Sequence, residues 1–155
     1  MDCYLAETAT VIGDVEIGNN CSIWFNAVIR GDVHFIKIGN NTNVQDNAVI
    51  HATYKKSPTI IGNNVTIAHN AVVHGCTLHD NVMVGISSVV LDDVVVESNS
   101  IIAAGSVVTK GTRVESGSVY AGVPAKKIKE ISPELLDGEI KRIAKAYGMY
   151  SSWYK

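Results

Sequence analysis

The stretch IGNNVTIAHNAVV, residues 61–73, carries an aliphatic side chain at every sixth position. The same spacing extends through most of the chain, with breaks of nine, eleven and five residues. A period of six matches neither an α-helix nor simple strand alternation, whereas three such units close one coil with a short strand on each of three sides. The repeated aliphatic residues are Ile17, Ile23, Ile29, Ile38, Val44, Ile50, Ile61, Ile67, Val73, Leu78, Val84, Val90, Val96, Ile102, Val108 and Val114.

Stacked coils pair as parallel strands about 4.8 Å apart, which turns the repeated aliphatic residues into ladders that fill a three-sided prism. The segments Ile17–Asn20, Ile38–Asn41 and Ile61–Asn64 each continue an aliphatic position with Gly-Asn-Asn. Glycine and asparagine tolerate the left-handed backbone that tight corners require. The sequence therefore predicts an all-β fold, a left-handed parallel β-helix of hexapeptide repeats, over residues 1–125.

A different pattern begins near the C-terminal end, because the repeat fades after Val119. The triplet Ser132-Pro133-Glu134 offers a helix N-cap, a proline at the first helical position and an acid in the first turn. We expect residues 126–155 to form a C-terminal helical segment that packs on the prism, as a cover or a trimer contact. The apolar residues that follow at helical spacing are Leu135, Leu136, Ile140, Ile143, Ala144 and Tyr147.

Composition limits the classes of function that fit the chain. With 155 residues, a formal net charge of −2 and no nucleic-acid-binding motif, it is expected to be one domain without a nucleic-acid partner. Neither a signal peptide nor an apolar run of membrane-spanning length is evident, so no membrane partner is expected. The cysteines are odd in number and lack CxxC spacing; they are Cys3, Cys21 and Cys76. Free thiols in a reducing cytoplasm are therefore the preferred interpretation.

The repeat also determines which polar side chains become neighbours. His51 and His74 each follow an aliphatic position and lie 23 residues apart, which is one coil plus a five-residue loop at Tyr54–Pro58. Arg30 lies 21 residues before His51, which is one coil plus a three-residue insertion. The sequence therefore predicts a row of Arg30, His51 and His74 along one face.

A second row lies on the adjacent face, because Asp46 and His69 are also 23 residues apart, with Gln45 beside them. Two stacked imidazoles can converge on one ion, since metal–nitrogen bonds are about 2.0–2.1 Å. His69 diverges from the first row within one prism, so a neighbouring subunit must bring the third imidazole. The expected assembly is a homotrimer with metal sites at the subunit interfaces, each built by His51 and His74 of one subunit and His69 of the next.

Structural interpretations compete with this hypothesis. An interface salt-bridge network is an equally good role for Arg30, Asp32 and Asp46. His34 and His79 lie outside both rows and are expected to be ordinary surface residues.

The segments Arg30-Gly31-Asp32, Asn43–His51 and His69–Cys76 resemble the gamma-class carbonic anhydrases and their bacterial homologues in order, residue type and spacing. The resemblance implies a lyase that hydrates carbon dioxide reversibly to bicarbonate by metal-bound hydroxide, with zinc, or else iron or cobalt, as cofactor. The implied ligands and pocket residues are His51, His69 and His74 for the metal, Gln45 for orienting the hydroxide, Arg30, Asp32 and Asp46 for an interface and substrate-side network, and Asn43 and Tyr120 near the pocket.

The sequence departs from the well-studied members at the positions of their proton-shuttle glutamates. Val33 follows Asp32, and Thr53–Thr59 holds no acid. Since fast turnover requires a group that passes the released proton to buffer, we expect a complete metal site with an incomplete proton path.

Three alternatives stay open at this point. The segment Tyr120–Lys126 resembles the end of hexapeptide acyltransferases, in which a histidine would act as general base in CoA-dependent acyl transfer. A metal-stabilised trimeric scaffold and a thioesterase-like hydrolase would use the same residues with little anhydrase activity.

Overall fold

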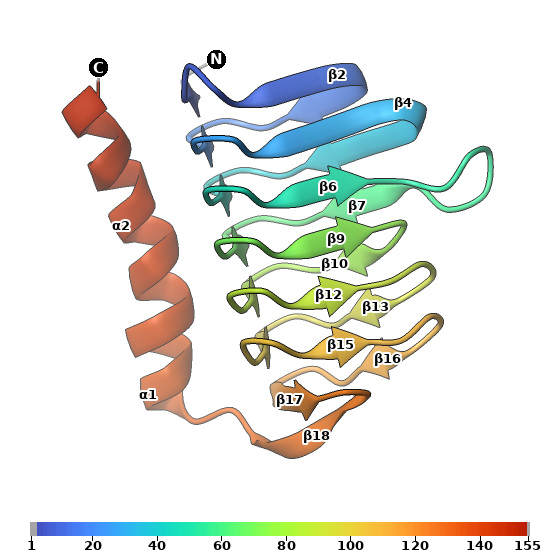
Figure 1. Ribbon diagram of the computed structural model, residues 1–155. Coiled ribbons are helices and arrows are strands. Elements are labelled where there is room, and N and C mark those ends of the chain that lie inside the picture. The colour runs from blue at the N-terminus through green and yellow to red at the C-terminus, as the bar shows by residue number, and fades with distance from the viewer. Residues whose placement is uncertain (1–2, 155) are drawn as a thin grey trace.

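The computed structural model describes residues 3–154 and shows a column of stacked coils with one helix beside it (Figure 1). The predicted parallel β-helix of hexapeptide repeats with a C-terminal helix is thereby confirmed. The strands are β1 (Tyr4–Leu5), β2 (Thr10–Ile17), β3 (Ser22–Ile23), β4 (Val28–Ile38), β5 (Asn43–Val44), β6 (Val49–His51), β7 (Thr59–Ile61), β8 (Thr66–Ile67), β9 (Val72–His74), β10 (Thr77–Leu78), β11 (Val82–Val84), β12 (Val89–Val90), β13 (Val95–Val96), β14 (Ser100–Ile102), β15 (Val107–Val108), β16 (Arg113–Val114), β17 (Ser118–Gly122) and β18 (Ala125–Glu130).

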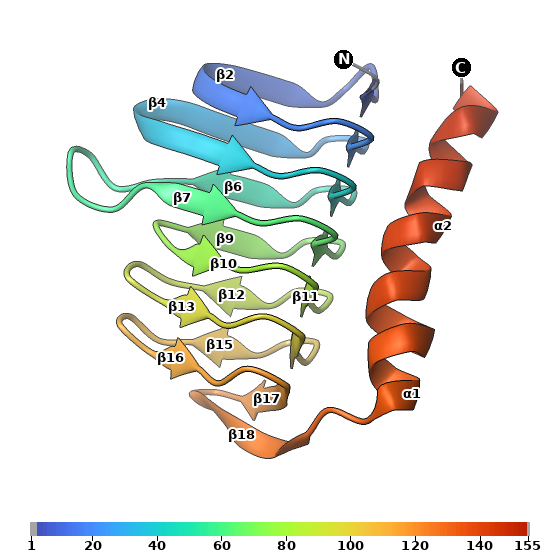
Figure 2. The same cartoon turned by 180° about the vertical axis from the view of Figure 1, so that it is seen from behind.

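The strands form two sheets that wrap three sides of the prism. The first has the order β1-β3-β5-β8-β11-β14-β17-β18. The second runs β15-β12-β9-β6-β4-β7-β10-β13-β16, with β2 pairing β4. It covers two sides because β4 is 11 residues long and pairs with β6 near its start and β7 near its end. Figure 2 shows these layers from behind.

Parallel register aligns the repeated aliphatic residues as predicted. Val84 pairs with Ile67 in the preceding coil and with Ile102 in the next. All three side chains are fully buried. Because each coil adds one inward side chain to every ladder, apolar burial stabilises the column along its whole length.

The corners confirm the expected use of asparagine. Asn20, Asn41 and Asn64 have φ angles of 56°, 53° and 55°, in the left-handed region. Their amides also stack, since Asn64 Nδ2 donates to Asn81 Oδ1 at 3.3 Å. The side chain that permits the turn thus also joins neighbouring coils.

The β-structure extends beyond residue 125, where the sequence analysis ended it. Strand β18 pairs antiparallel with β17 and covers the edge of that strand. The helical segment then comprises α1 (Pro133–Leu135), a π-helical stretch (Leu136–Lys141), α2 (Arg142–Ser151) and a 3₁₀ turn (Ser152–Tyr154). The predicted cap is present, because the Leu135 N–H donates to Ser132 Oγ at 3.2 Å.

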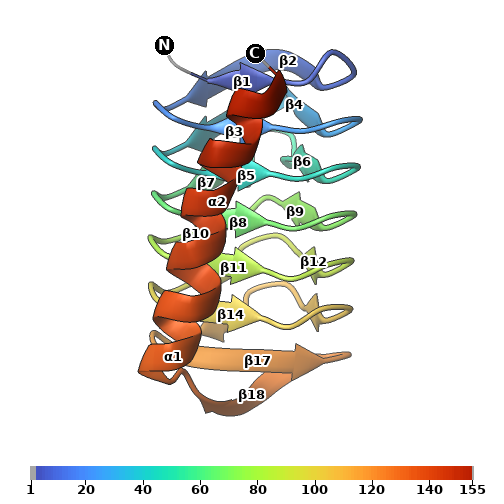
Figure 3. The same cartoon turned by 90° about the vertical axis from the view of Figure 1, so that its left-hand side faces the viewer.

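The helix returns along the outside of the first sheet, so its C-terminal end lies beside the first coils (Figure 3). Aromatic contacts hold that end, with ring centroids of Trp24 and Tyr147 5.3 Å apart and those of Tyr4 and Tyr154 5.9 Å apart. Ile140 is fully buried. Across residues 3–154, no helix has both the length and the apolar character needed to cross a membrane.

Candidate metal site

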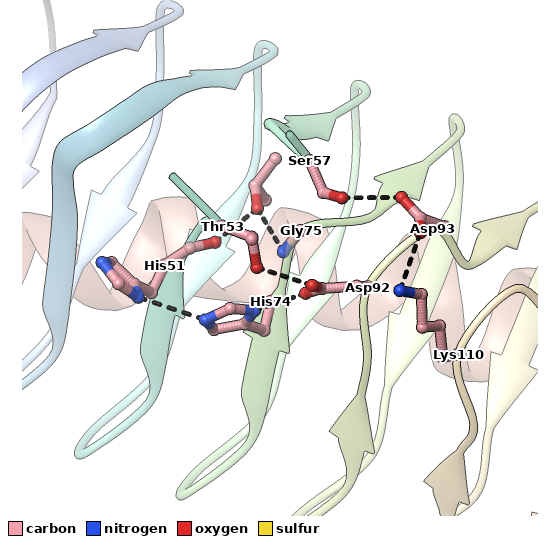
Figure 4. A network of polar contacts seen from close by, with 9 residues as sticks. His51, Thr53, Ser57, His74, Gly75, Asp92, Asp93 and Lys110 are labelled. Carbon is pink, nitrogen blue, oxygen red and sulfur yellow. Dashed lines mark hydrogen bonds and ion pairs between the residues drawn. The ribbon is translucent and has the colours of Figure 1, made fainter. Parts of the chain in front are cut away.

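His51 and His74 end adjacent strands and pair directly, His51 on β6 with His74 on β9. The Ile29–Ile50 and Ile50–Val73 pairings place Arg30 in the same row. His51 Nδ1 lies 3.1 Å from His74 Nε2. Figure 4 shows the two rings pointing toward each other. The row inferred from spacing therefore exists, and its two imidazoles converge.

Each ring of the pair engages an aspartate through its other nitrogen. His51 Nε2 lies 3.0 Å from Asp32 Oδ1, and His74 Nδ1 lies 2.6 Å from Asp92 Oδ1. Burial alone would raise the pKa of Asp32, but hydrogen bonds from Arg30 and His51 hold it below its usual value. Asp92 behaves likewise: burial raises its pKa, and hydrogen bonds from Thr53 and His74 lower it below the usual value. Both carboxylates are therefore charged at neutral pH and accept the imidazole N–H.

This arrangement decides which ring nitrogens are free. If both aspartates accept an N–H, the facing nitrogens of His51 and His74 each present a lone pair. Two lone pairs at 3.1 Å repel each other unless a cation lies between them. Two nitrogens bound to one tetrahedral ion at about 2.0–2.1 Å would lie roughly 3.3 Å apart. The pair therefore fits a shared metal ion with little movement of either ring.

His69 follows β8 on the adjacent face and has its own aspartate. Its Nδ1 lies 2.9 Å from Asp46 Oδ2, and its Nε2 lies 3.3 Å from the Tyr147 hydroxyl. Burial, with smaller effects of Asp46 and Tyr150, raises the pKa of Tyr147 to about 12. The phenol stays protonated at neutral pH and can donate to the Nε2 lone pair that a metal would use.

The three histidines do not meet within one subunit. In the part of the chain that the structure describes, no group of three His, Cys, Asp or Glu side chains could hold an ion. His51 and His74 offer two of the imidazoles needed for a three-histidine site. A three-histidine site would need its third imidazole from another subunit, so the shared site stays a prediction.

Gln45 and Asn43 lie buried beside His69. The backbone N–H of His69 donates to Gln45 Oε1 at 3.2 Å, and Gln45 Nε2 donates to Asn43 Oδ1 at 3.1 Å. Asn43 Nδ2 in turn donates to Thr66 Oγ1 at 2.9 Å. The chain of hydrogen bonds fixes both amides, which lie 4% and 1% exposed.

Arg30 and Asp32 form an ion pair, with 2.6 Å between Arg30 Nη1 and Asp32 Oδ2. Since Asp32 also holds His51, the pair connects directly to the histidine row. The salt-bridge and site roles that the sequence left open are thus compatible.

Tyr120 does not lie with these residues. It continues the inward ladder of Ile67, Val84 and Ile102, three coils away from Ile67, and is 7% exposed in the core. The aromatic hydroxyl that the structure places at His69 belongs to Tyr147.

Tyr147 and Asp92 contact candidate metal ligands, His69 and His74, but neither contact was predicted from the sequence. Helical spacing placed Tyr147 on an apolar helix face, but nothing local tells which coil that face meets. Register puts Leu91 beside His74, because Val73 pairs with Val90. The turn then brings Asp92, one residue further on, to the ring.

The three cysteines form no disulfide in this structure. Cys3, Cys21 and Cys76 are free. Burial raises the pKa of Cys21 to about 11 and that of Cys76 to about 12. The thiols of Cys21 and Cys76 are therefore neutral at physiological pH.

The chain is similar to known hexapeptide-repeat proteins in both sequence and structure. The family described as "Bacterial transferase hexapeptide (six repeats)" matches residues 1–31 and 75–110. A hexapeptide transferase family protein from Anaplasma phagocytophilum is 41% identical with a TM-score of 0.89, covering 99% of this chain and 93% of that one. The chain is thus a hexapeptide-repeat protein.

Two relatives with high sequence identity are named as carbonic anhydrases. A probable carbonic anhydrase of Methanocaldococcus jannaschii is 45% identical over 90% of this chain and 84% of that protein. Mitochondrial gamma carbonic anhydrase 2 of Arabidopsis thaliana is 47% identical over 86% of this chain and 50% of that protein. The chain belongs to the gamma-carbonic-anhydrase-like branch of the hexapeptide-repeat proteins, and it spans about half the length of the Arabidopsis relatives.

Proposed function

We propose that this chain is the subunit of a homotrimeric, metal-dependent carbonic anhydrase that hydrates carbon dioxide reversibly to bicarbonate. The observation that carries the proposal is the 3.1 Å approach of His51 Nδ1 to His74 Nε2. Aspartates engage the other nitrogen of each ring, as carboxylates commonly do behind the histidine ligands of metal sites. Membership in a family with named carbonic anhydrases supports the same reaction.

The third ligand in this proposal is His69 of the next subunit. Asp46 accepts from its Nδ1 and leaves Nε2 for the ion, provided that the Tyr147 hydroxyl gives way. Three neutral imidazoles with one open position are a typical catalytic zinc set, and iron or cobalt would accept the same donors. The trimer is therefore part of the catalytic site rather than only a packing arrangement.

An ion held by three imidazoles supplies a nucleophile from water near neutral pH. The other roles fall to side chains of this chain. Gln45 and Asn43 present amides that are held by hydrogen bonds and can orient the reacting oxygen. Asp32 and Asp46 hold ligand rings, Arg30 holds Asp32, and all three line the substrate side. Tyr147 takes the pocket position that was expected for Tyr120.

The proton released from water needs a path to solvent. No acid stands in Thr53–Thr59, and Asp32 and Asp92 are hydrogen-bonded to the ligand rings. We infer that buffer molecules take the proton directly and that this step limits turnover.

A CoA-dependent acyltransferase is the second candidate, favoured by the hexapeptide transferase relative. A general base needs one imidazole with a free nitrogen facing the substrate. At His51 and His74, the nitrogen that the aspartate leaves free instead faces the other imidazole at 3.1 Å. This geometry supports an ion site over a base. A trimeric scaffold or thioesterase-like hydrolase would share the ion.

Stopped-flow carbon dioxide hydration with a pH indicator tests the proposal on protein whose metal content has been verified. We expect a rate above buffer that disappears when the metal is removed by chelator and returns when zinc is added. Acetyl-CoA turnover and thioester hydrolysis are measured on the same preparation. A fully metallated trimer that is active only in one of those assays would support the corresponding alternative.

A cytoplasmic location belongs to the same proposal. The three free thiols support it, because oxidising compartments favour disulfides.

A further inference from the structure

The loop between β6 and β7 is tied at both ends to the turn that follows β12 (Figure 4). At its start, Thr53 Oγ1 donates to Asp92 Oδ2 at 2.5 Å. Near its end, Ser57 Oγ donates to Asp93 Oδ1 at 2.7 Å, and Lys110 Nζ lies 3.5 Å from Asp93 Oδ2. Two adjacent aspartates thus accept hydrogen bonds from the same loop. Of these two, Asp92 also contacts a histidine of the candidate metal site.

Asp92 uses both carboxylate oxygens. Oδ1 accepts from His74 Nδ1 at 2.6 Å, while Oδ2 accepts from Thr53. Because a carboxylate is planar, binding both oxygens fixes its orientation and with it the ring of His74. The ring then directs Nε2 at His51 Nδ1.

Gly75 makes room for this contact. A Cβ at this position would lie 2.4 Å from Asp92 Oδ1, and the residue has a φ of +57°. Its N–H donates to Thr59 Oγ1 at 2.9 Å, and Thr59 Oγ1 donates in turn to the carbonyl of His51 at 2.5 Å. The end of the loop therefore also joins the strands that carry the two histidines.

We propose that Asp92 is a positioning residue for the metal ligand His74, and that Thr53 holds Asp92 in place from the loop. The loop in which well-studied relatives carry shuttle glutamates thus supports the metal ligands in this chain. This inference rests on the proposed metal site, but not on the reaction carried out there. It predicts a contribution to metal affinity that the neighbouring Asp93 lacks.

The test measures zinc binding by the full-length trimer in competition with a chromophoric chelator, together with the visible absorption of the cobalt-loaded protein. Asp92→Asn should weaken zinc binding about 10–100-fold and alter the cobalt spectrum, as is typical when a carboxylate that holds a metal ligand is lost. Thr53→Val should change both in the same direction by a smaller factor. Asp93→Asn is the matched control, because it disturbs the same loop without touching His74, and it should bind zinc like the parent protein.

Zinc affinity and cobalt spectra of the variants distinguish the positioning role of Asp92 from simple anchoring of the loop. Parent-like zinc affinity and cobalt spectra in both Asp92→Asn and Thr53→Val would overturn the positioning role while leaving the metal site intact. Equal weakening in Asp92→Asn and Asp93→Asn would assign the effect to loop anchoring and overturn it too. A parent protein that binds no zinc would overturn the proposed function and this inference together. Thermal melting of metal-free protein identifies a variant that is merely unfolded, in which case Thr53→Val decides.

Discussion

His69 Nδ1 lies 2.9 Å from Asp46 Oδ2, so this ring, like those of His51 and His74, has one nitrogen engaged by an aspartate. Three histidines with three aspartates, two in one row and one on the adjacent face, are the central feature of this molecule. In the proposed site, the other nitrogen of each ring would bind the ion, with the Tyr147 hydroxyl moving away from His69 Nε2.

Replacing His69 should therefore remove metal as fully as replacing either member of the pair. We expect about one zinc or iron per subunit in the parent protein and little in His69→Ala, His51→Ala or His74→Ala. Elemental analysis of protein purified without chelator gives the numbers. His79→Ala is the surface control, since His79 lies outside both histidine rows and its Nε2 lies 3.8 Å from Glu97 Oε2. Full metal content in His69→Ala would show that the site does not need this ring.

Gln45→Ala should lower carbon dioxide hydration without loss of metal. The side chain is 4% exposed and fixed by Asn43 and the His69 amide, so it can orient a reacting group without coordinating the ion. We expect the rate to fall by about tenfold or more at constant zinc content. A rate equal to that of the parent protein would exclude Gln45 from the reaction.

Buffer dependence should reveal the missing proton path. Raising the concentration of a small imidazole buffer should increase the hydration rate until another step becomes limiting. Val33→Glu, which places an acid beside Asp32, should reduce this dependence, and Val33→Gln is its uncharged control. Rates that do not respond to buffer in the parent protein would mean that a side chain already carries the proton.

Cys21 should make stability sensitive to alkaline pH. Burial raises its pKa from 9.0 to about 11 in the folded chain, so the unfolded chain releases this proton first as pH rises. The stabilisation is complete below pH 9 and is lost as pH rises toward about 11. Urea unfolding at about pH 8 and about pH 11 should show a smaller fall for Cys21→Ala than for the parent protein. Equal falls would contradict the raised pKa.

The ladders and corners were predictable because each six-residue unit of the repeat determines its own strand and turn. Val84 follows Ile67 and precedes Ile102 in space, as counting along the chain suggests. The same counting placed His51 beside His74. The repeat was therefore sufficient to predict the fold and the pairing of His51 with His74.

The remaining site residues depend on geometry that no local pattern contains. Tyr147 reaches His69 across 78 residues of sequence, because the terminal helix folds back along the first sheet. Tyr120 was placed near the pocket by family resemblance. Its strand register instead directs the side chain into the core, where it is 7% exposed. Asp92 reaches His74 around a turn in which Gly75 supplies the space.

Subunit mixing tests the shared metal site most directly. Trimers of His69→Ala alone or His51→Ala alone contain no complete site, whereas a mixed trimer pairs the intact His51 and His74 of one subunit with the intact His69 of its neighbour. Unfolding and refolding the two variants together in equal amounts should restore roughly one quarter of the zinc of the parent trimer, since each mixed trimer regains one site. Zinc that stays at the level of the separate variants after verified mixing would contradict a metal site shared between subunits.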